Sequence, residues 1–102
     1  MASSQSYVTF IVDKLSPLGE VTVRKMMGEY CLYLNGKLVG DICDDTLFLK
    51  KFDTNAEFLQ DCLQSPPYEG AKPMYVPDVD DDTFLLRAVQ LTYDGAPERK
   101  KK

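Results

Sequence analysis

Basic side chains interleaved with tyrosine and methionine are the residues of this chain whose types could support binding chemistry. The basic set is Arg24, Lys25, Lys37, Lys50, Lys51 and Lys72. Cationic groups beside aromatic and thioether side chains can hold a partner through charge and apolar contact together. A simpler interpretation also stays open, in which these are ordinary strand-surface charges whose aliphatic stems lie on a sheet.

Catalytic chemistry finds little support in the composition. The chain has no histidine, which excludes a nucleophile activated by a histidine base. Its glycines are not arranged as a phosphate-binding loop that leads into a helix. The acidic run at 78–82 lacks the glycine and the distal glutamate of a calcium loop, and it is typical of a helix N-terminus. We therefore predict a protein that is not an enzyme and that uses no cofactor.

The three cysteines, Cys31, Cys43 and Cys62, lie in apolar patterns and form no Cys-x-x-Cys pair. We expect them to be buried free thiols. Without histidine, a zinc site would need acidic ligands beside scattered thiols, so we predict no metal site.

Charge is distributed unevenly along the 102 residues. The tail at 98–102 has four bases and one acid, a net charge of +3. Since the whole chain has a net charge of −4, residues 1–97 carry −7. Nine acids between positions 53 and 94 face only Lys72 and Arg87. Because an acidic body repels phosphate backbones, we expect no specific DNA binding by the protein alone. We predict one domain at 1–97, followed by a disordered basic tail at 98–102.

The elements that position the basic set begin with a helix and a four-stranded meander. Tyr7, Val8, Ile11, Val12 and Leu15 follow a helical period; Ser3 or Ser4 can cap this helix, and Pro17 and Gly19 stop it. Apolar residues then alternate between positions 21 and 49, which predicts strands with one buried face. Asn35-Gly36 predicts a type I′ hairpin, Asp44-Asp45 a second tight turn, and Gly28 a reversal.

The second half is predicted to add two helices and one strand. Asp53 or Thr54 caps a second helix with Phe58, Leu59, Cys62 and Leu63 on its apolar stripe, and this helix ends at Ser65-Pro66-Pro67. Prolines on both sides of 74–76 indicate an edge strand or an extended segment. A third helix follows the acidic run, and its apolar side comprises Phe84, Leu85, Ala88, Val89, Leu91 and Thr92.

This order, helix, four strands, helix, strand and helix, predicts an α+β fold: a two-layer sandwich of an antiparallel sheet with helices on one face. The predicted core is Leu32, Leu34, Leu38, Ile42, Leu47, Phe58, Leu59, Leu85 and Val89. Arg24 and Met26 should lie on the strand face opposite Val21 and Val23. Of Tyr30 and Tyr33, one should be in the core and one on the helix-free face.

Two blocks of sequence resemble the N-terminal domain of the TfoX/Sxy family of bacterial competence regulators. The first comprises Arg24-Lys25-Met26-Met27-Gly28, Tyr30, Leu32-Tyr33, Gly36-Lys37 and Asp45-Thr46-Leu47-Phe48-Leu49-Lys50; the second is Lys72-Pro73-Met74-Tyr75 with Pro77. The resemblance covers roughly residues 5–93 and rests on the order and spacing of the blocks. Met27-Gly28-Glu29 departs from the aromatic residue and two glycines that the family usually has there.

The resemblance implies a secretion-chaperone-like fold and a role in transcriptional control of competence genes, where the family works with the cyclic-AMP receptor protein. It also implies that Arg24, Lys50 and Lys72 occupy recurrent family positions. The candidate partner- or anion-binding residues are accordingly Arg24, Lys25, Met26, Gly28, Tyr33, Lys50, Lys72, Met74 and Tyr75.

We therefore expect a non-enzymatic regulatory or protein-interaction module whose partner belongs to the transcription machinery. The alternative is a chaperone-like protein, or one that binds a small ligand or an anion, with the same sandwich. A homodimer is compatible with either function. No apolar run reaches the roughly 20 residues that span a bilayer, and the N-terminus does not resemble a signal peptide, so we expect a cytoplasmic protein without a membrane partner.

Overall fold

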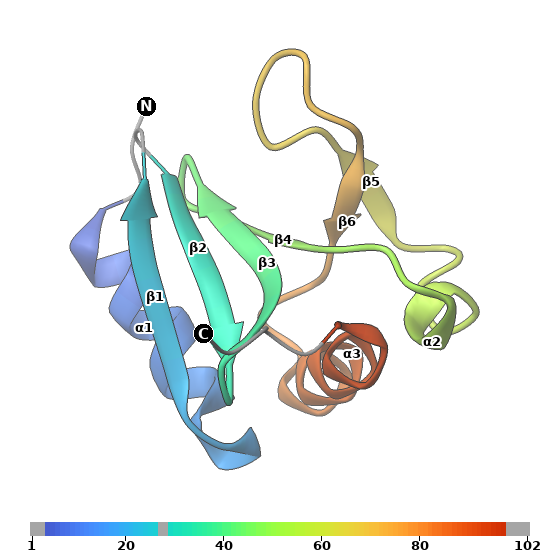
Figure 1. Ribbon diagram of the computed structural model, residues 1–102, viewed down its shortest axis with the longest axis horizontal. Helices are drawn as coiled ribbons and strands as arrows, with labels where there is room; N and C mark the ends of the chain where they lie inside the picture. The colour runs from blue at the N-terminus through green and yellow to red at the C-terminus, as the bar shows by residue number, and fades with distance from the viewer. Residues whose placement is uncertain (1–3, 27–28, 98–102) are drawn as a thin grey trace.

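The computed structural model describes residues 4–26 and 29–97. The elements follow the chain as α1 (Gln5–Leu15), a 3-10 turn η1 (Ser16–Leu18), β1 (Val21–Met26), β2 (Glu29–Leu34), β3 (Lys37–Cys43), β4 (Thr46–Leu49), α2 (Asp53–Ala56), β5 (Leu63–Ser65), β6 (Met74–Val76) and α3 (Asp82–Gly95). The strands form one sheet in the order β1-β2-β3-β4-β6-β5, and every pair is antiparallel (Figure 1). The α+β prediction is confirmed.

The meander forms as its turn residues predict. Asn35 and Gly36 have φ values of 50° and 86°, and Leu34 pairs with Lys37 across this two-residue loop. Asp44 and Asp45 also have positive φ, at 53° and 54°, in the second tight turn. Positive φ at both central positions matches the right-handed twist of the strands, so each turn sets the register of its hairpin. The expected reversal at Gly28 lies outside the described residues.

One register shift inside β3 corrects the predicted core. Leu32 pairs with Gly40 and Tyr33 with Leu38, so Val39 is an extra residue in β3. This bulge directs Val39 into the core, where it is fully buried, and leaves Leu38 half-buried on the other face. Gly40 is required next to it, because an added Cβ would lie 2.0 Å from the Phe48 carbonyl oxygen.

The second predicted helix is wrong beyond its first turn. Phe52, not Asp53 or Thr54, is the N-cap of α2, which ends at Ala56. Leu59 is buried as predicted, but Phe58 is 41% exposed and Leu63 is 69% exposed. The segment that ends at Ser65 is extended as β5 and pairs with β6. This pairing satisfies backbone groups of β6 that a helix at this position would have left without partners.

The short strand at 74–76 is not at an edge as expected, because β6 lies between β4 and β5. Pro73 and Pro77 flank it without removing a donor from its three residues.

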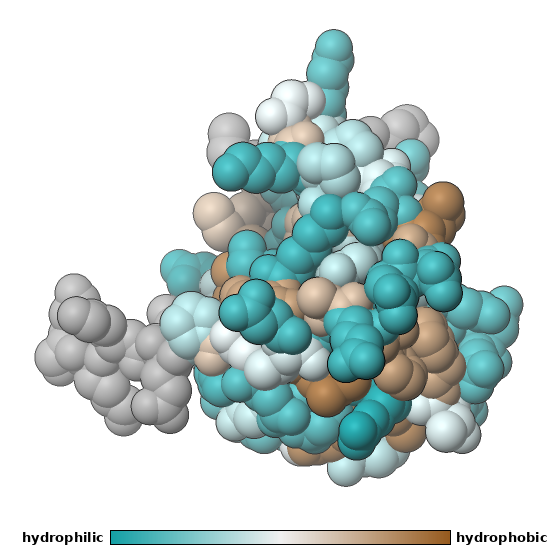
Figure 2. All heavy atoms as spheres, turned by 90° about the vertical axis from the view of Figure 1, so that its right-hand side faces the viewer, coloured by the Kyte–Doolittle hydropathy of each residue, from teal (hydrophilic) through white to brown (hydrophobic). Residues whose placement is uncertain are grey.

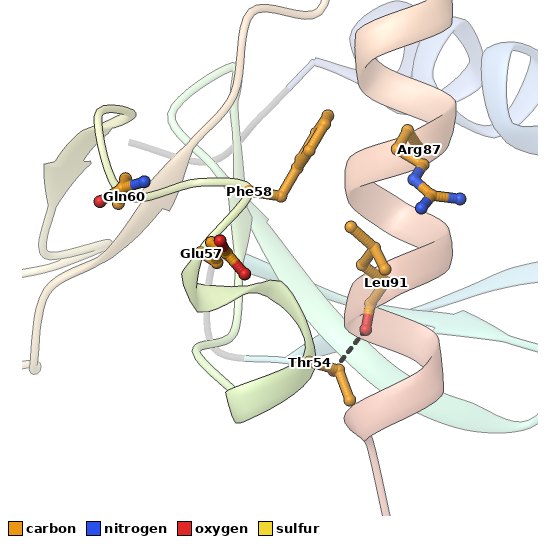
Figure 3. A pocket seen from close by; sticks show the side chains of 6 residues that line it. All are labelled: Thr54, Glu57, Phe58, Gln60, Arg87 and Leu91. Atoms are coloured by element: carbon orange, nitrogen blue, oxygen red, sulfur yellow. Dashed lines mark hydrogen bonds between the residues drawn. The ribbon is translucent and has the colours of Figure 1, made fainter.

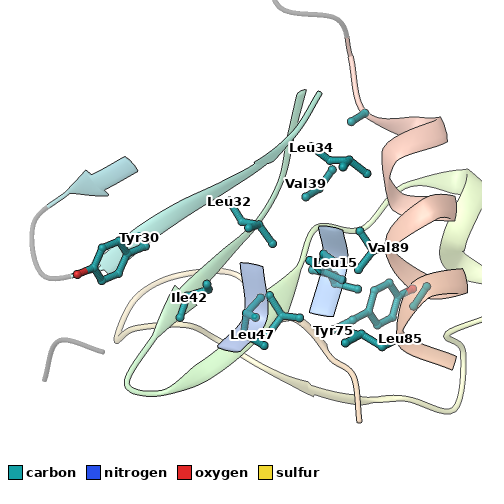
Figure 4. Packing of buried hydrophobic residues seen from close by; sticks show 14 of the residues in the cluster. Leu15, Tyr30, Leu32, Leu34, Val39, Ile42, Leu47, Tyr75, Leu85 and Val89 are labelled. Atoms are coloured by element: carbon teal, nitrogen blue, oxygen red, sulfur yellow. The ribbon is translucent and has the colours of Figure 1, made fainter. Parts of the chain in front are cut away.

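The helices α1 and α3 bury their apolar stripes on one face of the sheet. Ser4 caps α1 by accepting a hydrogen bond from the Tyr7 amide, and Asp81 caps α3 by accepting one from the Phe84 amide. Figure 4 shows Leu15, Leu85 and Val89 facing strand residues such as Leu32 and Leu47. The predicted burial of Leu32, Leu34, Ile42, Leu47, Leu59, Leu85 and Val89 is confirmed. The predicted tail at 98–102 lies outside the described residues.

Replacing Leu47 with alanine tests the strand phase. Leu47 is 1% exposed, so Leu47→Ala should lower the free energy of unfolding by about 2–5 kcal/mol through lost burial and a residual cavity. Leu63→Ala is the matched control, since the same truncation at a 69% exposed site should change it by no more than about 0.5 kcal/mol. Urea denaturation of both variants gives the comparison; similar losses at the two sites would contradict the assigned faces.

Candidate binding face and lysine pocket

The face of the sheet opposite α1 and α3 carries most of the candidate residues. Cross-strand pairs run Arg24 to Cys31, Cys31 to Asp41, and Asp41 to Phe48, so these four side chains share one face. Tyr33 lies on the same face, two residues beyond Cys31 on β2, whereas Tyr30 is buried among the core residues. The predicted division of the two tyrosines is confirmed. We call this surface the helix-free face.

Apolar side chains occupy the middle of the helix-free face. Phe48 is only 6% exposed although it points away from Leu47 and Leu49, and it is not part of the cluster that α1 and α3 cover. Pairing of Leu49 with Tyr75 places Met74 and Val76 on the Phe48 side. The face therefore combines a buried aromatic ring with partly exposed apolar neighbours and basic groups near its borders.

The structure separates the candidate residues that the sequence grouped together. Arg24 lies on β1, three strands from Lys50, a lateral separation of about 14 Å at about 4.8 Å per strand. Lys25 pairs with Tyr30 and so lies on the opposite strand face from Arg24. Tyr75 is 5% exposed and packs with the core, which makes it an unsuitable contact residue. Gly28 lies outside the described residues.

Lys50, Lys72 and Met74 do come together, in a pocket that also includes Lys51 and Pro73. Its volume is about 210 Å³. The antiparallel pairing of Leu49 with Tyr75 explains it, because the residues that follow β4 must then meet those that precede β6. We call this the lysine pocket. Lys51 belongs to the basic set but was not among the final candidate residues, and only the long-range pairing of β4 with β6 reveals its place in the pocket.

Two carboxylates on the helix-free face are partly withdrawn from water. Desolvation raises the pKa of Asp41 above 3.8, and the nearby Lys50 ammonium partly opposes this rise. Desolvation, followed by the charge of Asp41, raises the pKa of Glu29 above 4.5. The Oε1 atom of Glu29 is buried without a hydrogen-bond partner. Burial therefore disfavours the ionised form of both carboxyl groups.

The cysteines are half-buried, not fully buried as predicted. Desolvation raises the pKa of each of the three thiols above its ordinary value, which disfavours the reactive thiolate form. The Cys31 thiol lies 3.7 Å from the Met26 sulfur, and Cys62 donates to the Val76 carbonyl oxygen at 3.3 Å. In the part of the chain that the structure describes, no three cysteine or acidic side chains are placed to share a metal ion.

Asn55 holds the lysine-bearing segment against α3, and sequence reasoning missed it. Its amide nitrogen donates to the Lys50 carbonyl oxygen at 2.9 Å and to the Thr92 hydroxyl at 2.7 Å, and its amide oxygen accepts from the Phe52 amide at 3.0 Å. The side chain is completely buried. An asparagine three residues after a helix N-cap is a local signal for the Phe52 bond, but neither the Lys50 nor the Thr92 bond has one.

A second hollow, of about 530 Å³, separates α2 and the turn after it from α3 (Figure 3). Thr54 donates to the Leu91 carbonyl oxygen at 2.6 Å across its floor. Phe58 and Phe84 stack with ring centroids 5.2 Å apart. Figure 2, which views the molecule from the α2 side, shows hydrophobic side chains gathered low on a mostly hydrophilic surface. None of the residues that line this hollow was a candidate.

Replacing Asn55 tests its structural role. Asn55→Ala leaves several buried polar groups without partners, each at a cost of about 1–3 kcal/mol, so we expect a total loss of about 2–4 kcal/mol in the free energy of unfolding. Thr92→Val is the comparison, because it removes only one partner of Asn55 and the Thr92 bond to the Ala88 carbonyl oxygen. It should cost less than Asn55→Ala in the same urea titration. An alanine variant as stable as the parent would contradict the importance of this network.

Replacing Asp41 tests its desolvation. An acid with a raised folded-state pKa binds more protons folded than unfolded between its two pKa values, so stability falls as pH rises through that interval. Asp41→Asn should therefore raise the melting temperature at pH 7 and change it much less near pH 3, at about which the carboxyl is largely protonated in both states.

The exposed Asp61→Asn substitution provides the control for removing one negative charge. Equal gains from the two variants at pH 7, or an equal gain from Asp41→Asn at both pH values, would contradict the desolvation of Asp41.

Comparison with known proteins places this arrangement in a family. An uncharacterized 12.7 kDa protein in the trpE 5′ region of Spirochaeta aurantia is 42% identical over 78 residues, which cover 76% of this chain and 68% of the relative. The sequence pattern of the TfoX N-terminal domain matches residues 13–96, which include β1–β6, the lysine pocket and the whole of α3. The chain therefore belongs to the TfoX N-terminal domain family.

Proposed function

We propose that the domain is a non-enzymatic regulatory module that acts by binding a protein partner through its helix-free face. The observation that carries this proposal is the composition of that face. Met74 and Val76 lie half-buried beside the buried Phe48 ring and are not part of the cluster that α1 and α3 cover, Lys50 follows the strand of Phe48, and Arg24 lies on the same face three strands away. Protein interfaces combine an apolar centre with a polar and charged rim.

Family membership supports a transcriptional partner of the kind with which competence regulators work. The cyclic-AMP receptor protein and RNA polymerase are the candidates, in a cytoplasmic setting. No described helix is long and apolar enough to cross a membrane. The absence of histidine from the chain supports a binding role over a catalytic one.

We further propose that the isolated domain does not recognise a DNA sequence. A reading helix needs an N-terminus open to phosphate and a basic surface around it. At the N-terminus of α3, the Asp81 carboxylate already accepts a hydrogen bond from the Phe84 amide, and Asp80 and Asp82 are its neighbours in the sequence. DNA contact would then come through the protein partner.

Charge reversal on the two faces tests the proposal. Binding of immobilised domain to purified cyclic-AMP receptor protein and to RNA polymerase is measured by biolayer interferometry. Arg24→Glu should weaken binding about tenfold or more, because it places a like charge where an acidic partner group would lie. Arg87→Glu on α3 is the matched control and should leave affinity unchanged, since Arg87 is exposed on the helix layer.

Equal weakening by both variants would show that general charge, not the helix-free face, controls binding. If neither protein binds the parent domain, a direct role at the transcription machinery is contradicted.

A further inference from the structure

We propose that the lysine pocket is a binding site for a small organic phosphate monoester. The site lies where the end of β4 meets the start of β6, at the border of the helix-free face, with which it shares Lys50 and Met74. Lys50 and Lys51 approach from one segment, and Lys72, Pro73 and Met74 from the other.

The positive charge of the pocket is not neutralised by its own lining. Lys50, Lys51 and Lys72 contribute three ammonium groups, and no acidic residue lines the pocket. Within residues 4–26 and 29–97, none of the three lysines takes part in an ion pair. In a chain of net charge −4, three uncompensated lysines around one hollow create a local potential that attracts anions.

Two neighbours modify this charge. The Lys51 ammonium donates to the Gln64 side-chain oxygen and lies 5.5 Å from the centre of the Tyr75 ring, contacts that orient it without cancelling its charge. Asp41 attracts Lys50 from the helix-free face. Asp41 is therefore an internal carboxylate that we expect to compete with a bound anion for Lys50.

The number of cations favours phosphate over carboxylate. Lysine ammonium groups bind phosphate as compact point charges, and three of them around one hollow favour an anion of more than one negative charge. A phosphate monoester carries about −1.5 to −2 charges near pH 7 and three acceptor oxygens, so it can engage three ammonium groups that a single carboxylate cannot.

The size and walls of the pocket favour a small organic ester. Its volume of about 210 Å³ is below the range of roughly 300–1,000 Å³ that is usual for drug-sized ligands. Pro73 and Met74 provide an apolar wall beside the lysines. Free phosphate and a phosphate monoester share the anion chemistry, but only the ester has an apolar part for this wall.

Backbone geometry makes the pocket a fixed feature of the fold. The Lys50 amide donates to the Val39 carbonyl oxygen at 3.0 Å, and its carbonyl oxygen accepts from Asn55 at 2.9 Å. Met74 is held on the other side by pairing with Ser65. A ligand would therefore need to order the lysine side chains but not the backbone, which lowers the entropic cost of binding.

Titration of the full chain with inorganic phosphate and with phenyl phosphate, at constant ionic strength and followed by amide NMR shifts, tests the proposal. Saturable shifts at 50, 51, 72 and 74 are expected for both, with a dissociation constant on the order of 1 mM or tighter for phenyl phosphate. Met74→Ala should lower the affinity for phenyl phosphate and leave the affinity for inorganic phosphate unchanged. Equal affinity for both anions would identify free phosphate as the ligand and overturn the organic ester.

Four charge variants make the test specific. Lys50→Gln and Lys72→Gln should each weaken phenyl phosphate binding about tenfold. Asp41→Asn should strengthen phenyl phosphate binding, because the anion then has no competition from Asp41 for Lys50. Lys14→Gln is the control: it removes the same charge from α1, where Lys14 pairs with Asp82, and should have no effect.

Weakening by Lys14→Gln to the same extent would show unspecific charge attraction and overturn the site, as would linear shifts without saturation. The proposal would also be overturned, in favour of a nucleic-acid contact, if a DNA oligonucleotide shifted the pocket amides and phenyl phosphate did not. Because this readout uses no protein partner, its outcome is independent of the proposed binding at the helix-free face.

Discussion

A single buried amide, the side chain of Asn55, joins the sheet to the helix layer at the point on which both proposed sites depend. It bonds the Lys50 carbonyl oxygen and the Phe52 amide on one side and the Thr92 hydroxyl of α3 on the other. Thr92 in turn donates to the Ala88 carbonyl oxygen at 2.8 Å. In a buried environment such bonds are strong and an unpaired member is costly, so the chain leaves β4 in one direction only. That direction places Lys50 and Lys51 beside the start of β6.

The sheet register provides the second constraint, because it determines which face each side chain occupies. The bulge at Val39 adds one residue between two regular stretches of β3. As a result Leu38 and Asp41 lie on the helix-free face, and Val39 and Ile42 point to the core. Without the bulge, one of these stretches would exchange its apolar and polar faces. The cross-strand order from Arg24 to Phe48 is therefore a product of local backbone geometry as well as of composition.

Local patterns were sufficient to predict the first half of the fold but not the second. Asn35-Gly36 and Asp44-Asp45 encode their turns through backbone preferences that act over four residues, so the meander could be read directly. In contrast, Phe58, Leu59, Cys62 and Leu63 have helical spacing, yet only Leu59 among them is fully buried. Pairing with β6 overrides the helical preference after the first turn. That pairing depends on a partner about ten residues further along the chain, which periodicity cannot reveal.

The same distinction applies to the candidate residues. Lys50 and Lys72 are 22 positions apart in the sequence, and only the pairing of Leu49 with Tyr75 brings them to one pocket. Arg24 shares the helix-free face with Lys50 but is separated from it by the width of three strands, so the basic set divides into two groups. Asn55 was not predictable, because a buried asparagine is recognisable only by its partners, and Thr92 lies 37 positions away.

Asp41 is the element through which the two groups of basic residues can influence each other. It pairs with Cys31, the neighbour of Arg24, on one side and with Phe48 on the other, and its charge acts on Lys50. Because burial disfavours its ionised form, any anion that draws Lys50 away also removes the charge that stabilises the Asp41 carboxylate. On the proposal that the lysine pocket binds an anion, protonation of Asp41 and occupation of the pocket should therefore favour each other. By reciprocity, a partner that covers the helix-free face and further desolvates Asp41 should favour the same protonated state and leave Lys50 free for the anion.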